Sequence, residues 1–108
     1  MKKLILLATV LISTGSLAEE YTLDNLVDEM CALQGEYAAK VMEARQGGVP
    51  MSTLMGNLKS VDESQADLMR FLIKMAYKEN AYSSPGMQQR KIMEFRIKME
   101  SWCYEAFE

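Results

Sequence analysis

The stretch of sequence that decides the fold runs from residue 22 to residue 50 and reads TLDNLVDEMCALQGEYAAKVMEARQGGVP. Its apolar residues recur at intervals of three and four, which is the spacing of one face of an α-helix. Thr22 is a residue type that caps helix N-termini, and a Gly-Gly pair followed by Pro50 is a stop signal. The pattern therefore predicts a helix that begins after Thr22, ends near Gln46 and buries the face made by Leu26, Met30, Leu33 and Tyr37, widened by Val27, Cys31, Ala38, Val41 and Met42.

Three more helical segments follow this first one. A short segment over 51–59 has one apolar face and is weakened by Gly56, which costs about 1 kcal/mol relative to alanine. Ser60 and Glu63 match a capping box and predict a third helix from there to about Glu79. Ser84 is a good N-cap residue, Pro85 suits the first helical position, and an amphipathic pattern predicts a fourth helix over 85–106.

The third segment is apolar almost all round between Leu68 and Tyr77. A helix of this kind normally lies at the centre of a bundle. If it is not central, its surplus apolar surface is a binding face. Both interpretations stay open from the sequence alone.

Two cysteines, Cys31 and Cys103, predict one long-range disulfide. Antiparallel packing of the first and fourth helices puts both cysteines near the same end of the bundle, within the Cα separation that a disulfide requires. The sequence thus predicts an all-α fold: a small antiparallel helical bundle of three long helices and one short helix, stapled by one disulfide.

The first eighteen residues have the layout of a secretory signal peptide. Lys2 and Lys3 precede a short apolar run, and Ser16-Leu17-Ala18 places small residues at the cleavage positions. The apolar run is shorter than the roughly 20 residues that span a bilayer, and the rest of the chain has no second run of that length. We therefore expect a cleaved signal peptide over 1–18, one helical domain over 19–108, and a periplasmic or secreted protein without stable membrane insertion after cleavage.

The mature chain is acidic. Ten basic and fifteen acidic residues remain after Ala18, because Lys2 and Lys3 lie in the leader, and the net charge is therefore −5. Neutralisation of phosphates supplies most of the affinity of nucleic-acid-binding proteins, and anionic membranes attract basic segments. Neither nucleic acid nor an anionic membrane is an expected partner.

The sequence offers little for catalysis. It contains no histidine, which removes the commonest general base and the commonest metal ligand at neutral pH. No serine is marked out by its spacing for a Ser–Lys dyad, so we expect no enzyme and no cofactor. Nine methionines remain after the leader, and Met51 with Met55 would allow a Cu(I) carrier, although methionine more often fills an irregular core.

Six residues are candidates for contact with a partner protein: Arg45, Gln46, Phe71, Met75, Tyr77 and Tyr82. Arg45 and Gln46 belong to the most distinctive segment of the chain, and the others come from the apolar third helix and the turn after it. The structural alternative is an ordinary helix stop with a cation at the negative end of the dipole, and tyrosines that pack on the fourth helix.

The signal peptide, the early Cys31, the stretch Ala44-Arg45-Gln46-x-Gly48-Val49-Pro50, the tyrosine-rich turn and the late Cys103 together resemble a group of small exported proteins of proteobacteria and their prophages. The resemblance implies export and no particular site residues. Size and a single disulfide are also similar to those of periplasmic acid-stress chaperones, with no shared motif. We therefore expect a non-catalytic exported protein that binds another protein, and the resemblance implies a prophage-borne, envelope-directed role; the alternatives are a stress chaperone for unfolded chains and a Cu(I)-binding carrier.

Overall fold

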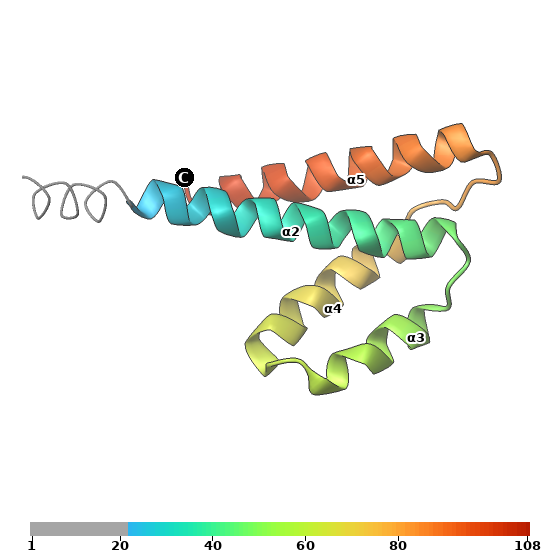
Figure 1. Ribbon diagram of the computed structural model, residues 1–108, viewed down its shortest axis with the longest axis horizontal. Helices are drawn as coiled ribbons and strands as arrows, with labels where there is room; N and C mark the ends of the chain where they lie inside the picture. The colour runs from blue at the N-terminus through green and yellow to red at the C-terminus, as the bar shows by residue number, and fades with distance from the viewer. Residues whose placement is uncertain (1–21) are drawn as a thin grey trace, which may run out of the picture.

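The computed structural model describes residues 22–108, which form a helical bundle (Figure 1). The elements are α2 (Leu23–Gln46), α3 (Met51–Gly56), the 3-10 turn η1 (Asn57–Ser60), α4 (Glu63–Tyr77) and α5 (Pro85–Glu105). The described part of the chain contains no strand, so the predicted all-α class is confirmed. The predicted signal peptide lies outside the described residues.

Both ends of α2 follow the local signals of the sequence. The Thr22 hydroxyl accepts a hydrogen bond from the Asn25 amide at 3.3 Å, which satisfies one of the free N–H groups of the first turn. At the other end Gly48 has a φ of +81°, a left-handed conformation that favours glycine. The chain therefore turns sharply after Gln46, as predicted.

The capping box expected at Ser60 and Glu63 is wrong. Ser60 closes the 3-10 turn, because the chain stays helical through Lys59 and the Val61 amide donates to the Leu58 carbonyl at 3.1 Å. The backbone becomes extended only at Val61 and Asp62, so α4 begins at Glu63 with Asp62 as its N-cap residue. The tertiary position of the short helix therefore overrides the local Ser-x-x-Glu signal.

The N-terminus of α5 is the one expected from Ser84 and Pro85. The Ser84 hydroxyl accepts from the Met87 amide at 3.3 Å, and Pro85 occupies the first turn, where it has no hydrogen bond to lose. The helix ends at Glu105, one residue before the predicted limit.

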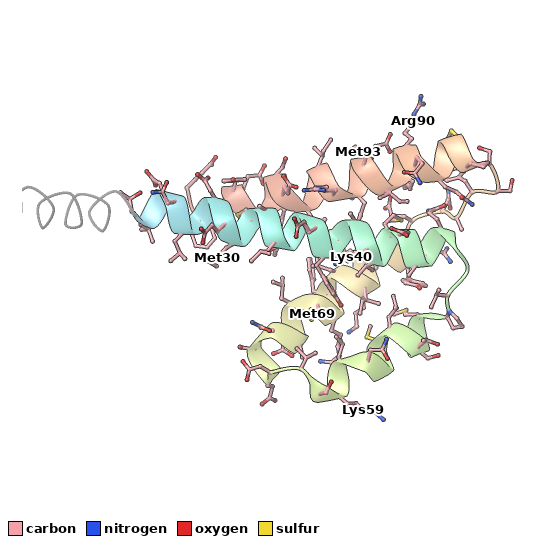
Figure 2. All side chains as sticks on the ribbon, viewed as in Figure 1. Met30, Lys40, Lys59, Met69, Arg90 and Met93 are labelled. Carbon is pink, nitrogen blue, oxygen red and sulfur yellow. A yellow bond between two sulfur atoms is a disulfide. The ribbon has the colours of Figure 1, made fainter. Side chains whose placement is uncertain are left out.

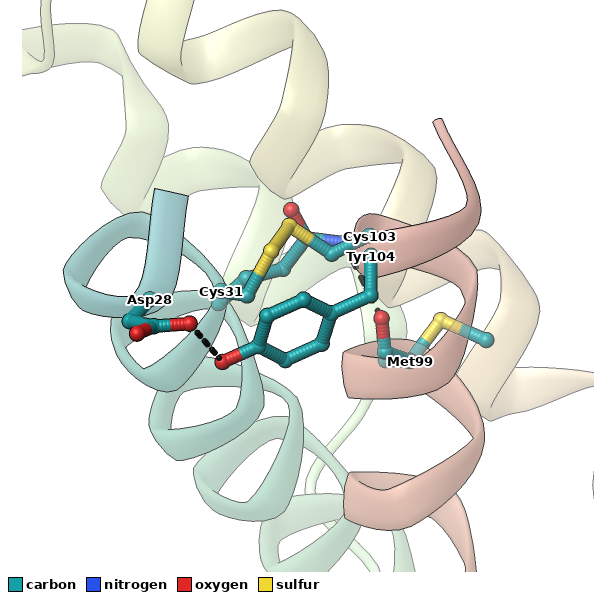
Figure 3. The surroundings of a disulfide bond; sticks show 6 residues. Asp28, Cys31, Met99, Cys103 and Tyr104 are labelled. Carbon is teal, nitrogen blue, oxygen red and sulfur yellow. Dashed lines mark hydrogen bonds between the residues drawn. A yellow bond between two sulfur atoms is a disulfide. The ribbon is translucent and has the colours of Figure 1, made fainter. Parts of the chain in front are cut away.

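The two longest helices lie side by side and antiparallel, joined by the disulfide (Figure 1). Cys31 and Cys103 are both buried, and their Cα atoms are 5.5 Å apart. Figure 3 shows the Tyr104 hydroxyl donating to the Asp28 carboxylate beside the bond, at 3.0 Å. The predicted staple between the start of α2 and the end of α5 is therefore confirmed.

The helix at the centre of the bundle is α2 and not α4. α2 packs on α5 along one face and on α4 along another, whereas α4 has α2, α3 and η1 as its main neighbours. α2 has 24 residues and is about 36 Å long, whereas α4 has 15 residues and is about 22 Å long. Only α2 is therefore long enough to pack on both of the other main helices. Of the two interpretations left open for the third helix, the central position therefore does not hold, and part of the apolar surface of α4 faces solvent.

The buried core lies where α2, α4 and α5 meet. It is built from the second half of α2, one residue of η1, one face of α4 along most of its length, and the middle of α5. Four methionines, Met51, Met55, Met69 and Met75, pack around it as half-buried side chains, as expected for a small irregular core. The core side chains are Ala38, Val41, Met42, Leu58, Ala66, Leu72, Ile73, Ala76, Phe95 and Met99.

Candidate functional site

An apolar cleft opens between the middle of α2 and α4. It has a volume of about 480 Å³. Figure 2 labels Met30 on the α2 side and Met69 on the α4 side. The full lining is Met30, Leu33, Gln34, Glu36, Tyr37, Lys40, Gln65, Leu68, Met69 and Leu72.

The cleft exists because α4 covers only part of the apolar face of α2. That face continues toward the start of α2 as a stripe of large side chains, Leu23, Leu26, Met30 and Leu33, at helical spacing. Leu33 is 65% exposed and Met30 is 45% exposed, although both belong to the face that the sequence predicted to be buried. The opening is therefore lined by apolar groups that no other part of the described chain covers.

An aromatic pair forms a separate exposed apolar contact between α4 and α5. The rings of Phe71 and Trp102 stack with their centroids 5.1 Å apart and their planes 25° apart. Phe71 is 37% exposed and Trp102 is 45% exposed, so the pair lies at the surface. Phe71 was one of the six predicted contact residues, whereas Trp102 was not among them.

Four of the six predicted contact residues meet at a different place, the junction of α2 with the turn before α5. The buried Gln46 amide donates from Nε2 to the Asn80 carbonyl at 2.8 Å, and its Oε1 accepts from the Tyr82 amide at 2.8 Å. Arg45 donates from Nε to the Glu79 carbonyl at 3.1 Å. These bonds tie the turn to the end of α2.

The tyrosines complete this junction. The Tyr77 hydroxyl donates to the Val49 carbonyl at 2.6 Å, and the Arg45 guanidinium lies 5.3 Å from the centre of the Tyr77 ring. Burial raises the pKa of Tyr77, and the charge of Arg45 partly opposes that rise. The Tyr82 carbonyl accepts from the side-chain Nε2 of Gln88 at 2.6 Å. The distinctive Arg45–Pro50 segment thus has a structural role that the sequence did not reveal: its side chains and backbone bind the turn that leads into α5.

Met75, the sixth candidate, is half buried against the core of α4. The predicted contact residues are therefore not one site. Phe71 belongs to the exposed apolar surface, Met75 to the edge of the core, and the other four to the junction.

Two electrostatic features accompany these sites. Burial raises the pKa of Tyr37, which lines the cleft. At the junction Lys91 forms an ion pair with Glu79; this contact lowers the pKa of Glu79 and raises that of Lys91. The ion pair thus joins the residues just after α4 to the first half of α5.

Within residues 22–108, no group of three or more cysteine or carboxylate side chains has the geometry to hold a metal ion. In the same range, every buried side-chain nitrogen and oxygen has a hydrogen-bond partner. None of the helices described here has both the length and the apolar character that crossing a membrane demands.

Comparison with known proteins gives no relative. No family model matches the chain, and no curated protein or solved structure matches it either.

Proposed function

We propose that this protein is an exported, non-catalytic binding protein that holds a segment of another protein in the cleft between α2 and α4. The observation that carries the proposal is the uncovered apolar stripe of α2 that runs into the cleft, with Leu33 65% exposed beside the α4 wall. Large contiguous apolar surface is typical of protein interaction sites. The stacked Phe71 and Trp102 add aromatic groups of the kind that dominate binding energy at interfaces.

The lining of the cleft suits a protein segment. Methionine side chains at Met30 and Met69 have three rotatable bonds and a polarisable sulfur, so they adapt to the shape of a bound side chain. Gln34, Gln65 and Lys40 lie among the apolar groups and supply hydrogen-bonding partners. Interfaces combine an apolar centre with a polar rim in this way.

Export is part of the same proposal. Disulfides persist in oxidising compartments, and the Cys31–Cys103 bond supports a periplasmic or secreted location together with the signal peptide expected over 1–18. Mass spectrometry of the protein recovered from a native-like host should find an N-terminus at Glu19. Retention of Met1 on the bulk of the exported protein would contradict this. An envelope-directed, prophage-borne role is proposed on the resemblance of the sequence alone.

The binding function is tested by site-specific photo-crosslinking in cells that export the protein. A photoreactive amino acid replaces Leu33 in one variant and Ile97 in the other. Both side chains are more than half exposed, but Ile97 lies on α5, outside the residues that line the cleft. We expect a discrete protein adduct from position 33 and none from position 97.

A second pair of variants controls for a general decrease in exposed apolar surface. Met30→Ser removes an apolar group from the cleft, and Met93→Ser removes one of similar exposure from α5. Met30→Ser should abolish the adduct from position 33, and Met93→Ser should leave it unchanged. Identical adducts from positions 33 and 97, or none from either, would refute a binding cleft; a broad smear of adducts confined to position 33 would favour the stress-chaperone alternative.

A further inference from the structure

The exposed apolar stripe of α2 has the spacing of a surface through which helices pair. Leu23, Leu26, Met30 and Leu33 are separated by three, four and three residues, which is the a and d spacing of a coiled-coil seam. The same spacing continues to Tyr37, which packs against the buried core. The later part of this seam is therefore covered, whereas its first part is open over about 15 Å, from Leu23 to Leu33.

The open part of the seam lies on an arm, residues 23–33 of α2. In Figure 1 α4 approaches α2 toward the end of α2 and diverges from it toward the start, while α5 lies along the opposite side. Leu23 is 72% exposed, so the seam of the arm has little cover within residues 22–108. The molecule thus presents an apolar cleft between α2 and α4 and, beside it, an amphipathic helix whose own apolar face is open.

The charges at the cleft do not select a partner by their sign. Glu36 and Lys40 both line the cleft, which also contains the neutral amides of Gln34 and Gln65. A strongly charged segment of either sign would therefore meet a like charge there. The cleft instead favours an apolar helix face, since amphipathic helices dock into apolar grooves through anchors three and four residues apart.

We propose that the segment held in the cleft is the arm of a second copy of this chain; this inference rests on the proposed binding function. Two antiparallel arms related by a two-fold axis would place Leu23 of each copy near Leu33 of the other, and Leu26 near Met30. Each open seam is then covered by the other, and each arm reaches toward the α4 wall of the cleft at Leu68. A contact that joins the same surface of both copies closes after two copies and leaves no open stripe.

The position of α4 decides the direction of the arms. α4 packs on the later part of α2, from about Tyr37 onward, on the side where the seam lies. If two arms paired in parallel, both α4 helices would lie at the same level and compete for one space. Antiparallel arms put the two α4 helices at opposite ends of the joined pair, where there is room for both.

The acidic side chains of the arm allow this pairing. Asp28 is directed to α5, where its carboxylate accepts from the Tyr104 hydroxyl, and Asp24 lies one turn earlier on the same face. Glu29 is exposed next to Met30, so one carboxylate of each arm lies beside the seam. Charges at an exposed flank interact weakly through water, and burial of the large apolar side chains of the seam outweighs their repulsion.

The first test is sedimentation of the mature protein, residues 19–108, from about 1 to about 100 μM. We expect a monomer–dimer equilibrium. Leu33→Asp places a charge in the seam and should raise the dissociation constant at least about tenfold, whereas Ile97→Asp changes an exposed apolar residue of α5 outside the cleft and should alter it less than about twofold. Circular dichroism verifies that both variants remain folded.

A second test determines the direction of the arms. Leu23→Cys and Leu33→Cys each add one free thiol, and a bismaleimide shorter than the arm joins thiols without reacting with the Cys31–Cys103 bond. Identical positions lie about 15 Å apart along antiparallel arms, whereas positions 23 and 33 are neighbours. A mixture of the two variants, one of which carries a mass tag, should therefore give a crosslinked dimer with one copy of each, and either variant alone should give almost none.

Each outcome decides the proposal. A monomer at all concentrations, equal effects of Leu33→Asp and Ile97→Asp, or crosslinks between identical positions instead of between positions 23 and 33 would overturn the second copy as the occupant. In cells, the adduct from a photoreactive residue at position 33 should have twice the mass of the chain. If the adduct contains a different envelope protein, the binding function stands and only the identity of the occupant is wrong, whereas the absence of any adduct would contradict both.

Discussion

Removal of the disulfide should destabilise the protein severely. The bond joins residues 72 positions apart, and both sulfurs are buried between α2 and α5. In the chain-entropy model, closing a loop of this length in the unfolded state contributes about 4 kcal/mol of stability. For a domain of this size 1 kcal/mol corresponds to roughly 4–8 °C in Tm, so the double variant Cys31→Ala/Cys103→Ala should melt roughly 15–30 °C below the oxidised protein.

The measurement is thermal unfolding followed by far-ultraviolet circular dichroism. Replacement of two buried sulfurs also leaves small voids, so reduction of the wild-type protein serves as a perturbation that keeps every atom of the core. The reduced wild type should melt close to the double variant, and the reductant should not change the Tm of the variant. A decrease of less than about 5 °C in both samples would show that packing and not the staple holds α2 on α5, and it would refute the reasoning.

Three further predictions concern the junction, the ion pair and a helix cap. Gln46→Met should lower the free energy of unfolding by about 2 kcal/mol in a urea titration, because two backbone groups of the turn before α5 lose their partner; a loss below about 0.5 kcal/mol would contradict that role. Glu79→Gln should remove the stabilisation that the ion pair with Lys91 gives the folded state. Because the ion pair lowers the pKa of Glu79 in the folded protein, this stabilisation is fully present above the ordinary pKa of 4.5 and is lost as the pH falls through the folded pKa. Urea midpoints of the two proteins should therefore differ at neutral pH and converge in acid, and a constant difference down to full protonation would be evidence against the pair. Ser84→Ala should cost about 1 kcal/mol by removing the N-cap bond of α5, whereas the neighbouring change Ser83→Ala should leave the urea midpoint almost unchanged.

The cleft shows how a correct local pattern can mislead about burial. The stripe that includes Met30 and Leu33 has the periodicity of a buried face, and the helix that it predicts is confirmed. Periodicity reports which residues share a face, but it does not report whether a neighbour covers the whole length of that face. Here α4 is shorter than α2 and leaves the stripe from Leu23 to Leu33 exposed.

The junction shows the opposite error. Gln46 is polar and follows a helix, so local reasoning treats it as a surface residue that is free to contact a partner. The structure buries it, because its amide satisfies the Asn80 carbonyl and the Tyr82 amide, which lie 34 and 36 residues away in the chain. Hydrogen bonds between such distant segments leave no periodic signal in a single sequence.

The sequence by itself determined the helices, their caps at Thr22 and Ser84, the stop at Gly48 and the pairing of Cys31 with Cys103. Each of these depends on neighbours within a few residues, or on there being only two cysteines to join. Only the tertiary structure decided that α2 is the central helix, that Ser60 does not cap α4, and that Leu33 and Trp102 are exposed while Gln46 is buried. These outcomes depend on the relative lengths and directions of helices packed in space, and the physical reason is that burial belongs to pairs of surfaces, whereas a sequence pattern describes one surface at a time.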